Sequence, residues 1–339
     1  MPNGVQLPIP FPPRISPDFE RAESVHLEWP RSFGLICTEK AAQRHARARF
    51  VELAARFHPT AQGPDLDLAV DQLSWFFIYD DTFDALPGQD PDRARKYNDA
   101  LIELLDPTVV PPSEPILAAF ADMWRRTCEG MSAAWRARAS DSWRVLMNSF
   151  LAEVVHRRSG TILTSDEYMQ LRRDSIGVHP ILDLAERVGH FEVPEAAFKS
   201  DHLTAMRALA RDAVIFHNDI CSVEKEESWG DPHNLVLILE REQRCSRPAV
   251  IEFMREMVRE RLERFCGLEA SLVSLYESLG LNDRERESVR RYVGDALRSV
   301  VRGDYDWAEQ SGRYAASEAK GESRIPQGEN QCEVGQVLI

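Results

Sequence analysis

Hydrophobic and polar residues recur along this chain at intervals of three and four positions, the spacing of helices with one buried face. In residues 39–57, for example, Ala, Phe, Val and Leu follow this spacing among Arg and Glu. The same pattern covers residues 65–85, 116–131, 133–157, 201–227, 248–279 and 283–307. Alternating apolar and polar runs between turn residues, the pattern of a half-buried strand, are scarce. The chain is therefore predicted to be all-α.

Short segments rich in glycine and proline separate these stretches. They lie at Gly63-Pro64, Pro87-Gly88, residues 107–115, Gly160, Pro194, residues 230–232 and Gly280. None is a long linker and no repeat of fixed period is present, so one helical domain is expected over residues 1–314. Residues 315–339 lose the periodicity and gain Gly, Ser, Glu and Gln, a composition typical of a mobile tail.

Composition and charge restrict the class of protein. Hydrophobic residues make up 43% and charged residues 28% of the 339 positions, which are ordinary values for a globular protein. The net charge of −14 disfavours a nucleic-acid partner, because such a partner requires a basic surface. No apolar run approaches the roughly 20 residues of a membrane helix, and the start of the chain lacks a secretion-signal pattern. Six scattered cysteines without a Cys-x-x-Cys pair argue against a disulfide framework or zinc site, so a cytoplasmic protein is expected.

The first chemical motif is a group of aspartates that follows an apolar helical run. Asp80 and Asp84 are four residues apart, so they lie on one helix face with Asp81 beside them. Phe76 and Phe77 come one turn earlier on the same helix. A helix that ends just after this motif would place carboxylates at its C-terminal end, where a bound cation such as Mg²⁺ would compensate. A solvated acidic helix end is the alternative, but the aromatic residues beside the acids favour a metal site.

A second polar cluster lies much further along the chain. Asn218, Ser222 and Glu226 are spaced four residues apart and form one polar line along a helix. An amide oxygen, a hydroxyl and a carboxylate provide an oxygen-only ligand set for one hard cation. Lys225 adds a positive charge suited to a phosphate. An exposed helix face would give the same spacing by coincidence, but two such clusters on separate helices make coincidence a weaker explanation.

These two clusters resemble the signature motifs of a known family. Residues 80–84 match the Asp-Asp-x-x-Asp motif of the class I terpene synthases, and residues 218–226 match their Asn-Ser-Glu motif. Residues 74–77, 124–131 and 305–307 resemble bacterial members that are sesquiterpene cyclases. The resemblance implies a single-domain helical bundle around a central apolar cavity. It also implies three Mg²⁺ ions, a monomer or homodimer, and cyclisation of a linear isoprenoid diphosphate with release of diphosphate.

The resemblance also assigns groups that bind the diphosphate. In the family, an arginine four residues before a glycine at a helix break senses the anion. That spacing selects Arg173, with Gly177 as the backbone effector, while the distance to the Asn-Ser-Glu motif leaves Arg172 as the alternative. Arg313 and Tyr314 match the C-terminal Arg-Tyr pair that the family folds over the diphosphate.

The implied reaction requires a dry, apolar cavity, because water would quench the carbocation that forms when diphosphate leaves. Aromatic faces stabilise such a cation by about 0.5–2 kcal/mol each. Phe76, Phe77 and Trp307 are the candidates for this role, whereas core packing is the favoured interpretation of Phe57. These aromatic residues indicate a cavity for a fifteen-carbon chain, so farnesyl diphosphate is the expected substrate. Geranylgeranyl diphosphate, with twenty carbons, is the alternative.

Two positions depart from the sesquiterpene cyclases that the chain resembles. Those enzymes carry histidine directly after the tryptophan that corresponds to Trp307, where this chain has Ala308. They carry leucine before the motif asparagine, where this chain has His217. Both positions are expected to border the cavity, so the same product is not expected to follow from the resemblance. His217 itself is expected to be buried and hydrogen-bonded.

Three other functions compete with terpene cyclisation. A prenyl-chain-elongating synthase shares the fold and metal chemistry, but it would carry a second aspartate-rich motif in place of the Asn-Ser-Glu motif. A non-enzymatic helical scaffold would not need intact sets of metal ligands and anion-binding residues. A helical metal-dependent phosphohydrolase would need paired His and Asp ligands, which the sequence lacks. Magnesium-dependent terpene cyclisation is therefore the predicted function.

Overall fold

The computed structural model describes residues 5–85 and 90–311, and the side chains of residues 82–85 also lie outside this description. All regular elements of the described residues are helices, so the all-α prediction is confirmed. The helices are α1 (Phe19–Val25), α2 (Glu28–Ser32), α3 (Glu39–Arg47), α4 (Phe50–Phe57), α5 (Pro64–Ala85), α6 (Pro91–Glu103), α7 (Pro115–Cys128), α8 (Ala133–Ser159), α9 (Ser165–Ser175), α10 (Val178–Val188), α11 (Glu195–Phe198), α12 (Asp201–Trp229), α13 (Leu235–Gln243), α14 (Arg247–Ala270), α15 (Leu272–Ser278), α16 (Asp283–Arg291), a π-helical turn (Tyr292–Leu297) and α17 (Arg298–Gln310). The proposed domain end at residue 314 and the tail lie outside the described residues and stay predictions.

Several of the long predicted helices are present with small shifts at their ends, whereas the stretch 248–279 is divided at Ser271 into α14 and α15. Helices α5, α8 and α12 match the predicted stretches 65–85, 133–157 and 201–227 to within two residues. The stretch 39–57 is divided into α3 and α4, because Arg49 adopts a left-handed backbone with φ of 55°. Helices such as α9, α10 and α13 were not predicted, because their short apolar patterns do not extend over several turns.

Helix α5 carries the aspartate-rich motif, and its orientation is fixed by aromatic packing on one side. Trp75 stacks on Tyr79 with ring centroids 4.9 Å apart, and it also contacts Phe120 of α7 and Trp143 of α8. The indole Nε1 of Trp75 donates a hydrogen bond of 2.9 Å to the carbonyl of Ile116. The two phenylalanines that follow Trp75 therefore project from another side of α5, towards the interior between the helices.

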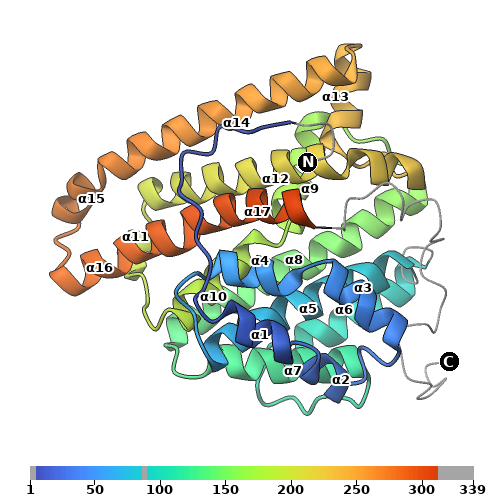
Figure 1. Ribbon diagram of the computed structural model, residues 1–339, viewed down its shortest axis with the longest axis horizontal. Coiled ribbons are helices and arrows are strands. Elements are labelled where there is room, and N and C mark those ends of the chain that lie inside the picture. The colour runs from blue at the N-terminus through green and yellow to red at the C-terminus, as the bar shows by residue number, and fades with distance from the viewer. Residues whose placement is uncertain (1–4, 86–89, 312–339) are drawn as a thin grey trace.

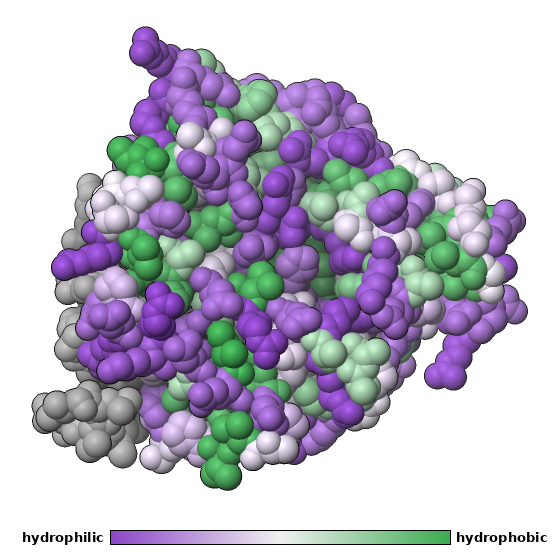
Figure 2. Space-filling model, turned by 180° about the vertical axis from the view of Figure 1, so that it is seen from behind, coloured by the Kyte–Doolittle hydropathy of each residue, from purple (hydrophilic) through white to green (hydrophobic). Residues whose placement is uncertain are grey.

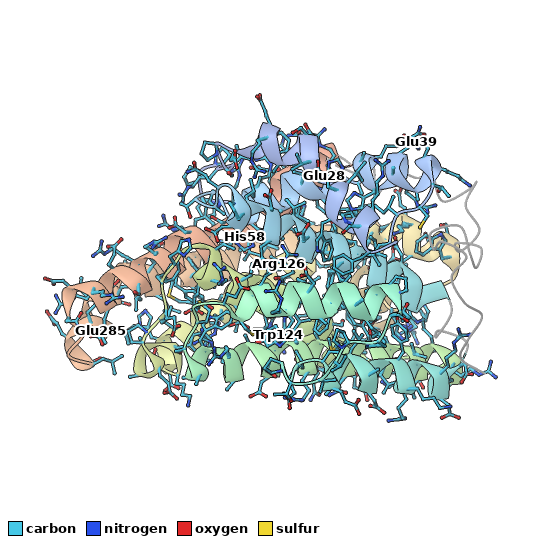
Figure 3. All side chains as sticks on the ribbon, turned by 90° about the horizontal axis from the view of Figure 1, so that it is seen from below. Glu28, Glu39, His58, Trp124, Arg126 and Glu285 are labelled. Carbon is cyan, nitrogen blue, oxygen red and sulfur yellow. The ribbon has the colours of Figure 1, made fainter. Side chains whose placement is uncertain are left out.

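Helix α7 contacts neighbouring segments through side chains on two of its faces. Figure 3 shows Trp124 and Arg126 on opposite sides of this helix. Trp124 is buried, and its Nε1 donates to the carbonyl of Leu105 at 3.0 Å. Arg126 pairs with Asp71 of α5 at 2.9 Å and with Asp122 at 2.9 Å. The ion pair between Arg126 and Asp71 thus holds α7 against the part of α5 that precedes the aspartate-rich motif.

Helix α12, which carries the second motif, lies between α14 and α17 (Figure 1). Ser200 caps its start by accepting a hydrogen bond from the Leu203 amide, and Gly230 ends it with φ of 72°. Figure 2 shows one face on which hydrophilic side chains predominate and which is hollowed near its centre. Among the described residues, no helix combines the length and apolar composition that crossing a bilayer requires.

Candidate active site

One cavity brings together side chains from α4, α5, α8, α9, α10, α12 and α17. Its apolar lining residues are Leu53, Phe57, Leu73, Phe76, Phe77, Ile176, Val178, Ile181, Val214, Trp229 and Trp307. Its polar lining residues are Asp80, Asp81, Glu153, Arg157, Tyr168, Arg172, Ser175, Asn218, Ser222, Lys225, Glu226, Asp231, His233 and Asp304. A cavity lined by both apolar and charged side chains fits a ligand that has a hydrocarbon part and an ionic group.

Both predicted metal-binding motifs open onto this cavity. Asp80 and Asp81 reach it from α5, while Asn218, Ser222 and Glu226 reach it from α12. The helical spacing of four residues explains why the three α12 side chains share one face. The two helices thus present oxygen atoms to the same space.

The α12 side chains are held in place by a residue outside the motif. Asn234, in the loop before α13, donates from Nδ2 to Glu226 Oε2 at 2.8 Å and to Ser222 Oγ at 3.3 Å. The same amide reaches the carbonyl of Asp219 at 2.8 Å. Neither periodicity nor the motif indicated Asn234, because it comes from another element and meets the site only in the folded chain. Its contacts make it a positioning residue for two candidate ligands.

The donor set fits Mg²⁺. Amide, hydroxyl and carboxylate oxygens are the ligands this ion takes, and it keeps room for water and phosphate oxygens. Desolvation, followed by the charge of Asp219, raises the pKa of Glu226 to about 7, and a bound cation would favour its charged form. No group of three or more His, Cys, Asp or Glu residues suited to a metal occurs among the described residues, so this set depends on its amide and hydroxyl oxygens.

The two arginines considered as the diphosphate sensor, Arg172 and Arg173, lie in different surroundings in the structure. Arg172 lines the cavity and donates from its guanidinium to Asn218 Oδ1 at 2.7 Å and to Asp219 Oδ1 at 3.3 Å. Arg173 is not a lining residue; its side chain is 39% exposed, and it pairs with Asp212 at 2.9 Å. The geometry therefore brings Arg172, the alternative in the sequence analysis, to the candidate ligands, while it places Arg173 elsewhere.

Arg172 is held by a buried network that keeps it charged. Asp219 is buried and also accepts a hydrogen bond of 2.8 Å from the Tyr168 hydroxyl and one of 2.9 Å from the Leu235 amide. Burial by itself would lower the pKa of Arg172, but Tyr168 and the carboxylates of Asp219, Glu153 and Glu226 raise it. The second residue of the Asn-Ser-Glu motif thus orients an arginine rather than lining the cavity itself.

The predicted aromatic residues form one wall of the cavity. The rings of Phe76 and Phe77 meet edge to face at 5.5 Å, and Phe77 lies 6.1 Å from Trp307. Trp307 is fixed by a hydrogen bond of 2.9 Å from its Nε1 to the carbonyl of Ala48. Phe57, for which core packing was favoured, is 5% exposed yet contributes to the lining.

Gly177 supports this wall from the break between α9 and α10. Its φ is +77°, and a Cβ atom there would lie 2.8 Å from Cζ of Phe76. We expect Gly177→Ala to cost about 2 kcal/mol in stability, because it adds both left-handed strain and a clash. Activity should fall as well, because the ring of Phe76 has to move into the cavity.

Gly130→Ala is the matched control for Gly177→Ala. Gly130 has almost the same φ of +76°, but nothing lies within 4 Å of the position of its missing Cβ. Thermal unfolding and turnover measured on both variants separate strain from contact. Equal losses of activity in the two variants would contradict a role of the Gly177–Phe76 contact.

The prediction of a buried, hydrogen-bonded His217 is confirmed. His217 is 3% exposed, and its Nδ1 lies 2.6 Å from Oδ2 of Asp304, a lining residue on α17. Burial opposes protonation of the imidazole, but Cys221 and Asp304 together raise its pKa to about 10. The raised pKa favours the protonated form of the buried His217. The sequence analysis did not single out Asp304.

Three candidate site residues cannot be placed. The side chain of Asp84 and the residues Arg313 and Tyr314 lie outside the described part of the chain. Their roles stay predictions from the resemblance.

Comparison with known proteins identifies the family of this chain. Residues 71–264 match the family model described as terpene synthase family 2, C-terminal metal binding. A pentalenene synthase from Streptomyces avermitilis is 50% identical over 320 residues, which cover 94% of this chain and 95% of that protein. A (-)-beta-caryophyllene synthase from Saccharothrix espanaensis, named as cyclising (2E,6E)-farnesyl diphosphate, is 38% identical and covers 94% of this chain and 91% of its own length.

Solved structures of terpene synthases have the same fold as this chain. Linalool/nerolidol synthase from Streptomyces clavuligerus in complex with 2-fluorogeranyl diphosphate superposes with a TM-score of 0.82 at 33% identity, over 91% of this chain and all of that one. An a-eudesmol synthase superposes with a TM-score of 0.84 at 31% identity, over 91% of this chain and all of that one. The chain belongs to the terpene synthase family.

Proposed function

We propose that this protein cyclises farnesyl diphosphate to a cyclic sesquiterpene, with Mg²⁺ as cofactor and release of diphosphate. Asp80 on α5 and Asn218 on α12 open onto one cavity that is also lined by Phe76, Phe77 and Trp307, and this observation supports the proposal most strongly. Relatives named pentalenene synthase and farnesyl diphosphate-cyclising caryophyllene synthase support a fifteen-carbon substrate. A count of three Mg²⁺ ions and a cytoplasmic location belong to this proposal through the family resemblance.

The polar side of the cavity binds the ionic head. Asp80 and Asp81 on one helix and Asn218, Ser222 and Glu226 on the other would hold Mg²⁺, which when bound supplies Lewis-acid neutralisation of the diphosphate charge. Arg172 and Lys225 line the same region and donate hydrogen bonds to the anion, so that it leaves as a stabilised group. Asp84, Arg313 and Tyr314 are proposed as further contacts on the basis of the resemblance.

The apolar side of the cavity receives the isoprenoid. Loss of diphosphate breaks an allylic C–O bond and leaves a carbocation on the hydrocarbon. Phe76, Phe77 and Trp307 turn π-faces and apolar edges towards it and exclude water, which would otherwise capture it as an alcohol. The chain folded against this wall brings its double bonds close to the cationic carbon, and ring closure moves the positive charge to a new carbon. The cyclised cation then loses a proton from a neighbouring carbon to the released diphosphate, and the C–H electron pair forms the double bond of the neutral product.

Incubation of the purified full chain with farnesyl diphosphate and Mg²⁺, followed by gas chromatography with mass spectrometry, tests the proposal. We expect cyclic fifteen-carbon products and an equal amount of diphosphate, both abolished by EDTA and restored by added Mg²⁺. Parallel arms contain geranylgeranyl diphosphate alone, or farnesyl plus isopentenyl diphosphate. Cyclic products only from the twenty-carbon substrate would indicate a diterpene cyclase, and consumption of isopentenyl diphosphate would indicate an elongating synthase.

A further inference from the structure

One ion pair at the cavity involves none of the candidate metal ligands or candidate diphosphate-binding residues. Asp304 lies on α17, one turn before Trp307, and its carboxylate lines the cavity although the residue is only 5% exposed. Its Oδ2 lies 2.6 Å from Nδ1 of His217 on α12. His217 is itself not a lining residue, so the anionic member of the pair is the one that borders the cavity.

The imidazole is enclosed on its other sides. Its Nε2 lies 3.4 Å from the sulfur of Cys221, and its ring centroid lies 5.4 Å from that of Tyr305. These contacts from α12 and α17 leave the ring one orientation, with Nδ1 directed at Asp304. The carboxylate is thereby fixed in position rather than free to turn between alternative partners.

Another buried carboxylate on the same helix provides a contrast. Asp306 accepts from Arg56 at 3.0 Å and from Arg302 at 2.8 Å, and it is not part of the cavity lining. Its charge is thus used in holding α17 to α4. Asp304 has no arginine or lysine partner among the described residues, and its only ion-pair partner there is the histidine behind it.

We propose that Asp304 determines which product the enzyme forms, by placing a fixed negative charge at the apolar wall of the cavity, and that His217 is the residue that positions it. This inference rests on the proposed cyclase function. Asp304 borders the cavity and the imidazole lies behind it, so a carbocation in this site is closer to the carboxylate than to the histidine. At short range the carboxylate attracts the cation more strongly than a ring quadrupole does. Among the isomeric carbocations that interconvert in the cavity, those with their positive carbon closest to Asp304 are therefore favoured over those near Phe76 or Phe77.

The first test compares product ratios from farnesyl diphosphate for wild type, Asp304→Asn and Asp306→Asn. Asparagine keeps the shape of the side chain and removes its charge. We expect the share of the main product to fall at least about fivefold in Asp304→Asn, with another fifteen-carbon terpene taking its place. Asp306→Asn is expected to keep the wild-type ratio even if its melting temperature drops. An unchanged ratio in Asp304→Asn, or an equal change in Asp306→Asn, would overturn the proposal.

Variants of His217 test the positioning role. The side-chain amide of asparagine can place a donor near the site of Nδ1, so His217→Asn should retain most of the wild-type ratio, whereas His217→Leu should shift it as Asp304→Asn does. If single variants fail to fold because one charge is left buried, the double variant His217→Leu with Asp304→Ser removes both charges at once. It is expected to show the shifted ratio, and a wild-type ratio in that variant would refute the inference.

The outcomes separate this inference from the proposed function. If the wild-type protein forms no terpene from farnesyl diphosphate, the proposed function fails. If the wild type forms cyclic terpenes and every variant forms them in the same ratio, the function stands and the role of Asp304 is refuted.

Discussion

Replacing Asn218 and Ser222 together with alanine is expected to lower kcat/KM for farnesyl diphosphate by at least about a thousandfold, with little change in melting temperature. A thousandfold corresponds to about 4 kcal/mol of transition-state stabilisation, a reasonable loss for removing two oxygen ligands of a catalytic cation. Asn218 also accepts a hydrogen bond from Arg172, so its removal loosens the cationic side of the same site. Asp80→Ala, on the opposing helix, should have an effect of similar size.

Folding and chemistry can be separated in this experiment. Glu224→Ala is the matched control, because Glu224 lies within the same motif segment of α12 but is exposed to solvent. It should retain wild-type turnover. Calorimetric titration with diphosphate in the presence and absence of Mg²⁺ gives a readout that does not depend on turnover, and Mg²⁺-dependent binding should be lost in the double variant. Full activity in that variant, or in Asp80→Ala, would refute the metal-binding assignment.

The metal-binding face could be predicted from the sequence because it depends on local geometry. Once residues 201–227 are helical, the interval of four residues places Asn218, Ser222 and Glu226 on one side whatever the rest of the chain does. The same interval relates Asp80 and Asp84 on α5, although the side chain of Asp84 lies outside the described residues. That the two faces meet in one cavity depends on packing, and only the resemblance to a known family predicted it.

Other parts of the site could not be predicted because they depend on contacts between distant segments. Asn234, in the loop before α13, donates hydrogen bonds to side chains of α12, and the sequence of neither segment indicates this contact. Asp304 and His217 belong to different helices, so nothing in the spacing of either residue indicates their pairing. The division of residues 39–57 depends likewise on the left-handed backbone of Arg49, a residue type with no preference for that conformation.

The interval of four residues before Gly177 indicated Arg173, but a residue interval that ends in a helix break does not define which face of the helix a side chain occupies. Gly177 itself lies in the break between α9 and α10 with a left-handed backbone, so its direction is not tied to that of the α9 side chains by the regular helical rotation. Adjacent residues within α9 differ by about 100° in direction, so an error of one residue moves the side chain to another face. The distance to the Asn-Ser-Glu motif, which is ambiguous by one residue, leaves Arg172 as the alternative, and Arg172 is the one that lines the cavity.

Arg172→Gln is therefore expected to lower kcat/KM by at least about a hundredfold, while Arg173→Gln changes it by less than about threefold. Loss of one preorganised donor at a site of developing negative charge costs about 10²–10³ in kcat. Arg172 is such a donor, because Asp219, which itself accepts a hydrogen bond from Tyr168, holds its guanidinium at the cavity. Arg173 instead pairs with Asp212 at the side of α12 and is partly exposed, so its loss should lower the melting temperature slightly.

The measurement is steady-state kinetics with farnesyl diphosphate for both glutamine variants and for Arg172→Lys. Lysine keeps the charge but not the forked geometry, so an intermediate loss is expected if the guanidinium orients the anion as well as attracting it. Binding of diphosphate measured by calorimetry should weaken in Arg172→Gln and stay near wild type in Arg173→Gln. The reverse order of the two glutamine variants would mean that the interval to Gly177 marks the sensor and that the side-chain positions on α9 change when substrate binds.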